Sequence, residues 1–109
     1  MALYLFQVAY TAEAWANQIK SPRNRIDEVK AMLEGTNVRI RDAWYAFGEY
    51  DLVLVVEAPG NVEYASVAIA TASGGALKAA KSTPLMSIED GIEAIRGAGQ
   101  VGYRPPGTE

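Results

Sequence analysis

Residues 50–58 read Tyr-Asp-Leu-Val-Leu-Val-Val-Glu-Ala and form the strongest β-strand pattern in the chain. Side chains alternate between the two faces of a strand, so Leu52 and Leu54 share one face and Val53 and Val55 share the other. The strand is therefore apolar on both faces. It must lie inside a sheet, where helices cover one face and another surface covers the second.

The remaining patterns supply the other elements of such a sheet. They predict strands at residues 3–10, 37–46, 50–58 and 76–86. Helices are predicted over about residues 12–20, between the N-cap Asn24 and the C′ residue Gly35, over about residues 62–73 behind the N-cap Asn61, and after Ser87. The order βαββαβ plus a C-terminal helix predicts a ferredoxin-like α+β domain with an antiparallel sheet. We expect this domain to span residues 1–99 and a flexible tail, rich in Pro and Gly, to span residues 100–109.

The second face of the sheet predicts a partner. The two principal helices of a ferredoxin-like domain lie on one face, which leaves apolar residues of the first and third strands exposed on the other. That patch is larger than a monomer normally carries. We expect a second copy of the sheet to cover it, which makes the protein a homodimer or a higher homo-oligomer. The alternative is that the C-terminal helix and tail fold back over this face of their own chain.

Composition excludes several classes of function. The chain has 109 residues, neither cysteine nor histidine, and a formal net charge of −3. Disulfides, zinc–thiolate sites and Ser–His or Cys–His relays are thereby excluded, and no basic field exists to hold a nucleic acid. The N-terminal residues do not resemble a signal peptide, and no apolar stretch approaches the ~20 residues of a membrane span. We therefore expect a cytoplasmic protein with no membrane or nucleic-acid partner and no metal. We also expect no cofactor; Gly74-Gly75, for example, lacks the spacing of a phosphate-binding loop.

Charged residues near the turn that opens the third strand are candidates for catalysis. Gly48 is expected to adopt a positive φ in this turn. Asp51 is either a general base or a hydrogen-bond acceptor at a strand edge. Arg25 lies in the first turn of a helix, where a cation opposes the helix dipole, so we expect it to have a partner. That partner is Asp51 or Glu57 in a structural salt bridge, or the carboxylate or enolate of a substrate.

Aromatic residues predict a ligand pocket between the helices and the sheet. Trp44 and Tyr45 are adjacent, so they lie on opposite faces of their strand, one in the core and one facing the partner sheet. Glu57 is either paired with a cation in the subunit interface or an acid in the pocket, and Lys78 is a candidate for an anionic ligand. The alternative for the aromatic residues is ordinary core packing. The candidate ligand-binding residues are Tyr10, Trp15, Asn24, Trp44, Tyr45, Glu57 and Lys78.

Short motifs in a fixed order resemble the GYD domain family over about residues 3–97. They are Tyr10-Thr11, Pro22 with Asn24-Arg25, Phe47-Gly48-Glu49-Tyr50-Asp51-Leu52-Val53, Glu57-Ala58-Pro59, Gly74-Gly75-Ala76-Leu77-Lys78, and Thr83-Pro84-Leu85-Met86-Ser87 with Glu89 and Gly91. The resemblance implies a ferredoxin-like domain of the dimeric α/β-barrel type. It implies no particular reaction, because the family is known chiefly as small bacterial proteins of uncharacterised function.

Three functions agree with these observations. The first is a homo-oligomeric protein that binds or senses a small molecule. The second is a cofactor-independent monooxygenase or isomerase that acts on a small aromatic or enolisable compound, with Asp51 or Glu57 as the base and Arg25 holding the anion. The third is a structural oligomerisation module. A polar pocket in which a carboxylate and Arg25 converge would favour the enzyme, and an apolar pocket would favour binding.

Overall fold

The computed structural model describes residues 1–107. Within these residues lie the strands β1 (Ala2–Tyr10), β2 (Arg39–Tyr45), β3 (Leu52–Ala58) and β4 (Leu77–Leu85). The helices are α1 (Ala12–Lys20), α2 (Arg25–Met32), α3 (Asn61–Ser73) and α4 (Ile88–Ala98). The order of these elements confirms the arrangement that the sequence predicts.

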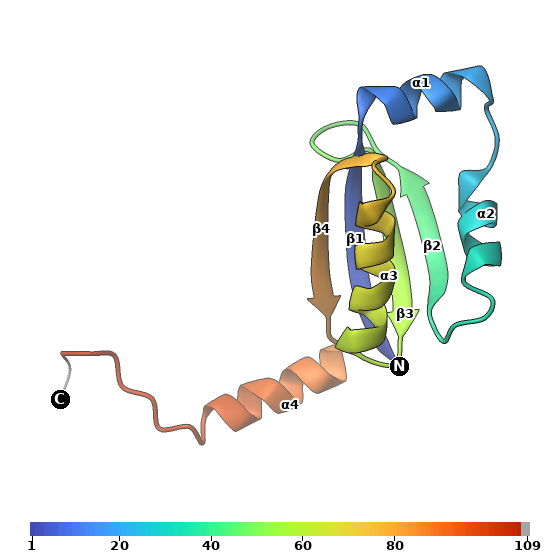
Figure 1. Cartoon of the computed structure of the whole chain (residues 1–109). Coiled ribbons are helices and arrows are strands. Elements are labelled where there is room, and N and C mark those ends of the chain that lie inside the picture. The colour runs from blue at the N-terminus through green and yellow to red at the C-terminus, as the bar shows by residue number, and fades with distance from the viewer. Residues whose placement is uncertain (108–109) are drawn as a thin grey trace.

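The strands form one antiparallel sheet in the order β2-β3-β1-β4. This is the strand order of a ferredoxin-like α+β domain. Figure 1 shows α3 running along the sheet and α1 lying across one end of it. Residues of both α2 and α3, Ile26 and Val67 among them, pack against the same core, so these two helices cover the same face.

Alternation along β3 produces the two faces that the sequence predicts. Leu52, Leu54 and Val56 are buried under the helices, whereas Val53 and Val55 are only partly buried on the other side. We name this second side the open face. Its side chains, placed by the strand register, include Leu3, Leu5, Trp44, Val53, Val55, Glu57, Lys81 and Leu85.

An aromatic cluster anchors α3 on the helix-covered face. The ring of Tyr64 stacks on Tyr4 at a centroid distance of 4.0 Å and meets the edge of Phe6 at 6.1 Å. The Tyr64 hydroxyl and Ser82 Oγ form a 2.6 Å hydrogen bond, which joins α3 to β4. Burial raises the pKa of Tyr64, so the hydroxyl remains protonated at neutral pH.

The C-terminal helix does not fold back over the open face. Beyond β4, α4 projects away from the body of the domain, as Figure 1 shows, and it packs against no other helix or strand of the described residues to any substantial extent. The radius of gyration is therefore 18.0 Å, compared with about 13 Å for a compact chain of this length. The expected alternative, a cover made by the chain's own C-terminal helix, is wrong in this structure.

Several element boundaries differ from the expected ones. β3 begins at Leu52, because Asp51 lies in the preceding turn. Asn61 is the first residue of α3 and not its cap, since its side chain accepts a hydrogen bond from the Tyr4 hydroxyl. α2 ends at Met32, and Gly35 does not have a positive φ. Gly48 does, at +147°, as expected.

The predicted tail follows α4. Residues 100–107 contain neither helix nor strand, and residues 108–109 of the predicted tail lie outside the described residues. No helix among the described residues is both long and apolar enough to cross a membrane.

Candidate functional site

An apolar cavity of about 290 Å³ lies between the helices and the sheet. We name it the inner cavity. Its floor is the helix-covered face of β1 and β3, and its walls are α2, α3 and the start of β4. Its apolar lining includes Phe6, Ile26, Val29, Leu54, Val67 and Leu77.

The inner cavity exists because α2 does not pack tightly onto the sheet. No residue of α2 is fully buried. Ile26 and Val29, which the helical spacing predicts as an apolar stripe, are half-buried and form a wall of the cavity. Apolar side chains that a closely packed helix would bury in the core therefore surround an open space.

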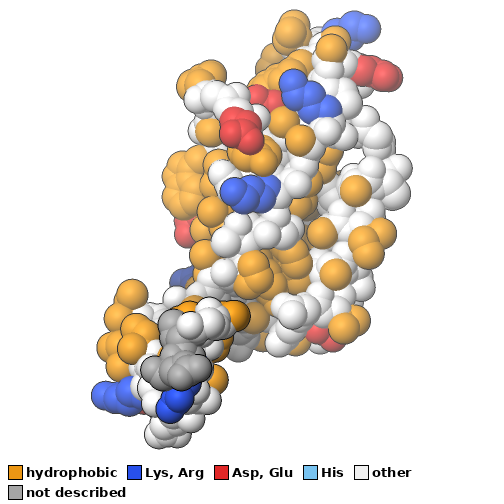
Figure 2. All heavy atoms as spheres, turned by 90° about the vertical axis from the view of Figure 1, so that its left-hand side faces the viewer, with side chains coloured by type: hydrophobic (Ala, Val, Ile, Leu, Met, Phe, Trp, Pro, Cys, Tyr) orange, Lys and Arg blue, Asp and Glu red, His pale blue; other side chains and the backbone are white. Residues whose placement is uncertain are grey.

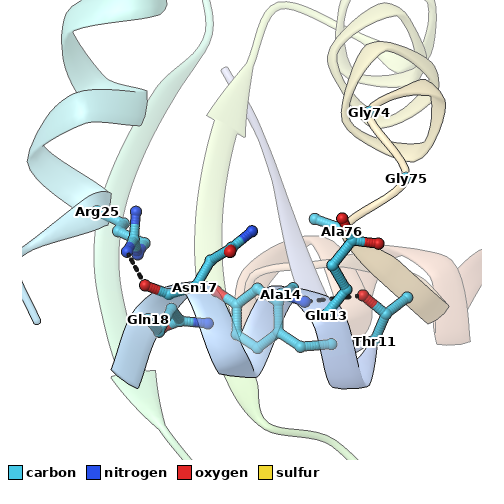
Figure 3. Close-up of a pocket in the computed structure, with 10 residues that line it drawn as sticks. Thr11, Glu13, Ala14, Asn17, Gln18, Arg25, Gly74, Gly75 and Ala76 are labelled. Atoms are coloured by element: carbon cyan, nitrogen blue, oxygen red, sulfur yellow. Dashed lines mark hydrogen bonds between the residues drawn. The ribbon is translucent and has the colours of Figure 1, made fainter. Parts of the chain in front are cut away.

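A second, more polar hollow of about 330 Å³ adjoins this cavity. We name it the outer hollow. Figure 3 shows residues of α1 on one side of it and Gly74 and Gly75, after α3, on another. Tyr10, Arg25 and Ala76 line both spaces, so these three residues form the boundary between them.

Arg25 carries an unpaired donor at this boundary. Its Nη2 donates to the carbonyl oxygens of Asn17, at 3.2 Å, and Ser21, at 3.0 Å, at the end of α1 (Figure 3 shows the bond to Asn17). A cation there is favourable, because the C-terminus of a helix carries partial negative charge. Its Nε is buried and is the one buried side-chain nitrogen or oxygen without a partner in residues 1–107. The expected salt bridge from Arg25 to Asp51 or Glu57 is wrong, since backbone carbonyls take its place.

Tyr10 contributes a hydroxyl close to Arg25. Burial is the main cause that raises the pKa of Tyr10, and the nearby Tyr45 and Asp51 raise it further, whereas the positive charge of Arg25 lowers it. The balance is upward, so the hydroxyl is protonated at neutral pH and is able to donate a hydrogen bond. The boundary thus combines a guanidinium and a phenol, both of which are donors.

Asp51 has a structural partner. Its Oδ2 accepts a 2.8 Å hydrogen bond from the backbone nitrogen of Tyr10, and its own backbone nitrogen donates to the carbonyl of Val8 at 2.8 Å. Both bonds tie the β2–β3 turn to β1. Asp51 lines neither the inner cavity nor the outer hollow.

The structure brings three of the four predicted aromatic residues together. The Trp15 ring lies 5.2 Å from that of Tyr10 and 6.4 Å from that of Tyr45, whose hydroxyl donates to Gln18 Oε1 at 3.1 Å. Trp44 lies on the open face, 56% exposed, and Tyr45 is also exposed, so neither is in the core. The four aromatic residues do not line one common space: Tyr10 lines the inner cavity and Trp15 contacts the Tyr10 ring, whereas Trp44 and Tyr45 line a separate hollow together with Asn24.

The other candidate residues lie away from the inner cavity. Asn24 caps α2, because its Oδ1 accepts hydrogen bonds from the backbone nitrogens of Ile26 and Asp27. Glu57 lies on the open face, 3.9 Å from Arg41. Lys78 is exposed and forms no ion pair within residues 1–107. No group of acidic side chains in this part of the chain is arranged to hold a metal ion.

Sequence reasoning missed Val67, Thr71 and Leu77 as lining residues of the inner cavity. The signal was the run of small side chains in α3, among them Ala68 and Ala72, which indicates a helix that approaches the sheet closely. The same small side chains also leave space beside the helix. Only the position of α2 decides which of these two outcomes occurs.

Comparisons with known proteins agree with the fold. A family model described as GYD domain matches residues 4–95. The crystal structure of MtbAldR is similar, with a TM-score of 0.57 and 16% identity, covering 79% of this chain and 53% of that chain, so the chain spans about half the length of MtbAldR. The crystal structure of FFRP-DM1 is similar with a TM-score of 0.53 and 15% identity, covering 79% of this chain and 100% of that one. At such identities the likeness shows a shared fold alone. No curated protein matches the chain.

Proposed function

The chain belongs to the GYD domain family, and from that premise we propose that it is a homo-oligomeric protein that binds a small molecule. The ligand has an apolar body, which occupies the inner cavity, and a head group that accepts hydrogen bonds at the boundary with the outer hollow. A carboxylate is the head group that best matches a guanidinium and a phenol.

The observation that carries this proposal is the buried, unpaired Nε of Arg25. Leaving a buried donor without a partner costs about 1–3 kcal/mol, and more when the donor is charged. A ligand acceptor at the boundary would remove that cost and add a charge-assisted hydrogen bond once the guanidinium turns its Nε, which is closed off from solvent in the empty site, toward the cavity. Tyr10, which also lines both spaces, supplies a second donor to the same group through its hydroxyl.

Size and lining restrict the ligand further. A cavity of about 290 Å³ lies at the lower end of small-molecule sites, which span roughly 300–1,000 Å³. Its apolar walls favour a short alkyl chain or a single aromatic ring. Glu13 lies on the outer hollow and would repel an anionic head group, but it is exposed, so water screens this repulsion strongly. Water screens the attraction between the head group and the half-buried Arg25 less.

Two of the three carboxylates near the site are already engaged, which supports binding over catalysis; the third, Glu13, is exposed on the outer hollow. Asp51, the proposed base, accepts a hydrogen bond from the backbone and lines neither space. Glu28 lines the inner cavity but forms a 2.5 Å ion pair with Arg23 at the surface. A general base must lie within hydrogen-bond reach of the proton that it removes, and neither carboxylate is free to do so beside Arg25.

The open face supports the homo-oligomeric part of the proposal. Its partly exposed Leu3, Leu5, Val53 and Val55, with the exposed Trp44, form an apolar surface on the two central strands and the edge strand β2. A second copy of the chain would cover this surface in an isologous dimer, in which both subunits use the same patch. We place this assembly in the cytoplasm. The chain has no cysteine, so its fold does not depend on disulfides, which form in oxidising compartments.

Binding of octanoate measured by isothermal titration calorimetry tests the proposed ligand class. We expect octanoate and phenylpropionate to bind and octylamine, which has a cationic head, not to bind. Arg25→Lys should weaken octanoate binding by roughly tenfold, because lysine keeps the charge and can still donate to the α1 carbonyls but lacks Nε–H. Arg23→Lys is the matched control: Arg23 is exposed and pairs with Glu28, so its replacement should leave the affinity unchanged. Equal affinities in Arg25→Lys and the unmodified protein would contradict the assigned head-group site.

A further inference from the structure

The C-terminal segment carries an apolar stripe that no other helix or strand of residues 1–107 covers to any substantial extent. We name residues 86–103, which include α4, the arm. Ile88, Ile92 and Ile95 follow one another at spacings of four and three residues, so they form a single stripe on α4. They are 79%, 43% and 73% exposed. Figure 2 shows the arm extending toward the viewer with hydrophobic side chains on its surface.

The length of α4 indicates that the stripe needs a surface to pack on. The helix has 11 residues, and isolated helices shorter than ~12–15 residues are marginal in water. Its capping is sound, because Ser87 Oγ accepts a hydrogen bond from the backbone nitrogen of Asp90, but one cap contributes only about 1 kcal/mol. Three exposed isoleucines provide the remaining stability only when something covers them.

The open face is the unpartnered apolar surface on the same chain, and the arm does not reach its own copy of it. Only Met86 and Ser87 separate β4 from α4, so the helix direction is set within two residues of the sheet edge. From there α4 leads away from the domain, which gives the molecule a longest dimension of 63 Å. An arm that leaves its own domain in this way is placed to reach a neighbouring molecule.

We propose that the arm of each copy packs on the open face of a second copy, so that two chains exchange arms about a two-fold axis. The Ile88, Ile92 and Ile95 stripe lies against the partner's open face, and the remainder of the two faces lie against each other. This inference rests on the homo-oligomeric part of the proposed function and specifies the surfaces that form the oligomer.

The open face carries one acidic side chain, Glu57, which lies 3.9 Å from Arg41, and one basic side chain that is complementary to the start of α4. The first turn of α4 carries Glu89 and Asp90, neither of which forms an ion pair within residues 1–107. Lys81 pairs with Gln7 across the sheet on the open face and is likewise without an ion-pair partner in that part of the chain. An arm that crosses to the second copy brings an acidic helix start to a basic residue.

The open face and the arm together, but neither alone, offer the area that each partner of a stable interface buries. Strands ~4.8 Å apart with a rise of ~3.3 Å per residue give the open face a footprint of roughly 400 Å². A helix of this length, at ~1.5 Å per residue and ~10 Å across, adds roughly 160 Å². Side-chain relief makes the accessible area larger than a flat footprint, so face and arm together approach the ~800 Å² that each partner of a stable interface buries. The arm alone does not.

Sedimentation equilibrium of the full chain tests the exchange. We expect the unmodified protein to be a dimer at micromolar concentration. Ile92→Glu should weaken the dimer by at least roughly 100-fold, because it places a charge in a buried apolar contact. Ala94→Glu adds the same charge to α4 away from the stripe and should leave the dimer intact. Trp44→Glu, an exposed position on the edge strand of the open face, should weaken the dimer as Ile92→Glu does.

Mixing the two defective variants distinguishes arm exchange from other dimers. A mixed pair of Ile92→Glu and Trp44→Glu retains one intact contact, from the normal arm of one chain to the normal face of the other. Dimers should therefore reappear in the mixture. A monomeric unmodified protein would overturn both this inference and the homo-oligomer, whereas a dimer that persists in Ile92→Glu, or a mixture that stays monomeric, would overturn arm exchange alone. Octanoate binding is a separate measurement and does not depend on either outcome.

Discussion

Replacing Tyr64 with alanine should lower the free energy of unfolding by about 3–5 kcal/mol, the cost that removal of a large buried aromatic side chain usually has. Tyr64 is the buried residue of α3. Its ring stacks on Tyr4, it meets Phe6 edge-on, and its hydroxyl bonds to Ser82. Removing the ring leaves a cavity between α3 and the sheet. Urea denaturation followed by circular dichroism measures the change.

Tyr64→Phe is the matched control for this result. It keeps the ring contacts and removes only the hydrogen bond to Ser82, so it should cost about 1 kcal/mol. If Tyr64→Ala were no more destabilising than Tyr64→Phe, α3 would not be anchored by the aromatic cluster that the structure shows.

Replacing Val67 with tryptophan should abolish octanoate binding. Val67 lies on α3, is partly buried and lines the inner cavity. An indole at this position would occupy the space that the alkyl chain needs, so we expect the affinity to fall by at least roughly 100-fold, while the strain of the larger side chain costs about 1–3 kcal/mol of stability. Calorimetric titration and urea denaturation of the same preparation measure the two effects separately.

Ile69→Trp is the control for the cavity-filling variant. Ile69 is on the same helix but is 69% exposed and lines no cavity described above. It should bind octanoate as the unmodified protein does. Octanoate binding of normal affinity in Val67→Trp would show that the alkyl chain is bound elsewhere on the molecule.

The sequence was sufficient for the topology because local patterns determine it. Strand alternation in residues 50–58, the cap at Asn24 and the cap at Ser87 each depend on a few neighbouring residues, and the structure reproduces them. The two-faced third strand is likewise a local pattern, and its burial alternates as expected.

The site could not be predicted in the same way. Ile26 and Val29 form an apolar stripe at helical spacing, but whether such a stripe fills a core or lines a cavity depends on how closely its helix approaches the sheet. That approach depends on every contact across the interface and is not encoded in the spacing of one helix.

The partner of Arg25 was also beyond the sequence pattern. The expected partners were carboxylates, because charge is visible in a sequence. The observed partners are the carbonyl oxygens of Asn17 and Ser21, which every residue possesses and which become acceptors only because α1 ends beside the start of α2. Asn61 was misassigned for a related reason: its partner, the hydroxyl of Tyr4, is distant in the sequence.

The direct test of the proposed binding site is a heteronuclear NMR titration of the full chain with octanoate. We expect the largest changes in the Nε–H signal of Arg25, which gains an acceptor, and in the backbone amides of Ile26, Val67 and Leu77 around the inner cavity. An Arg25 Nε–H signal that does not move, with the largest changes instead on the open face around Val53, would contradict it.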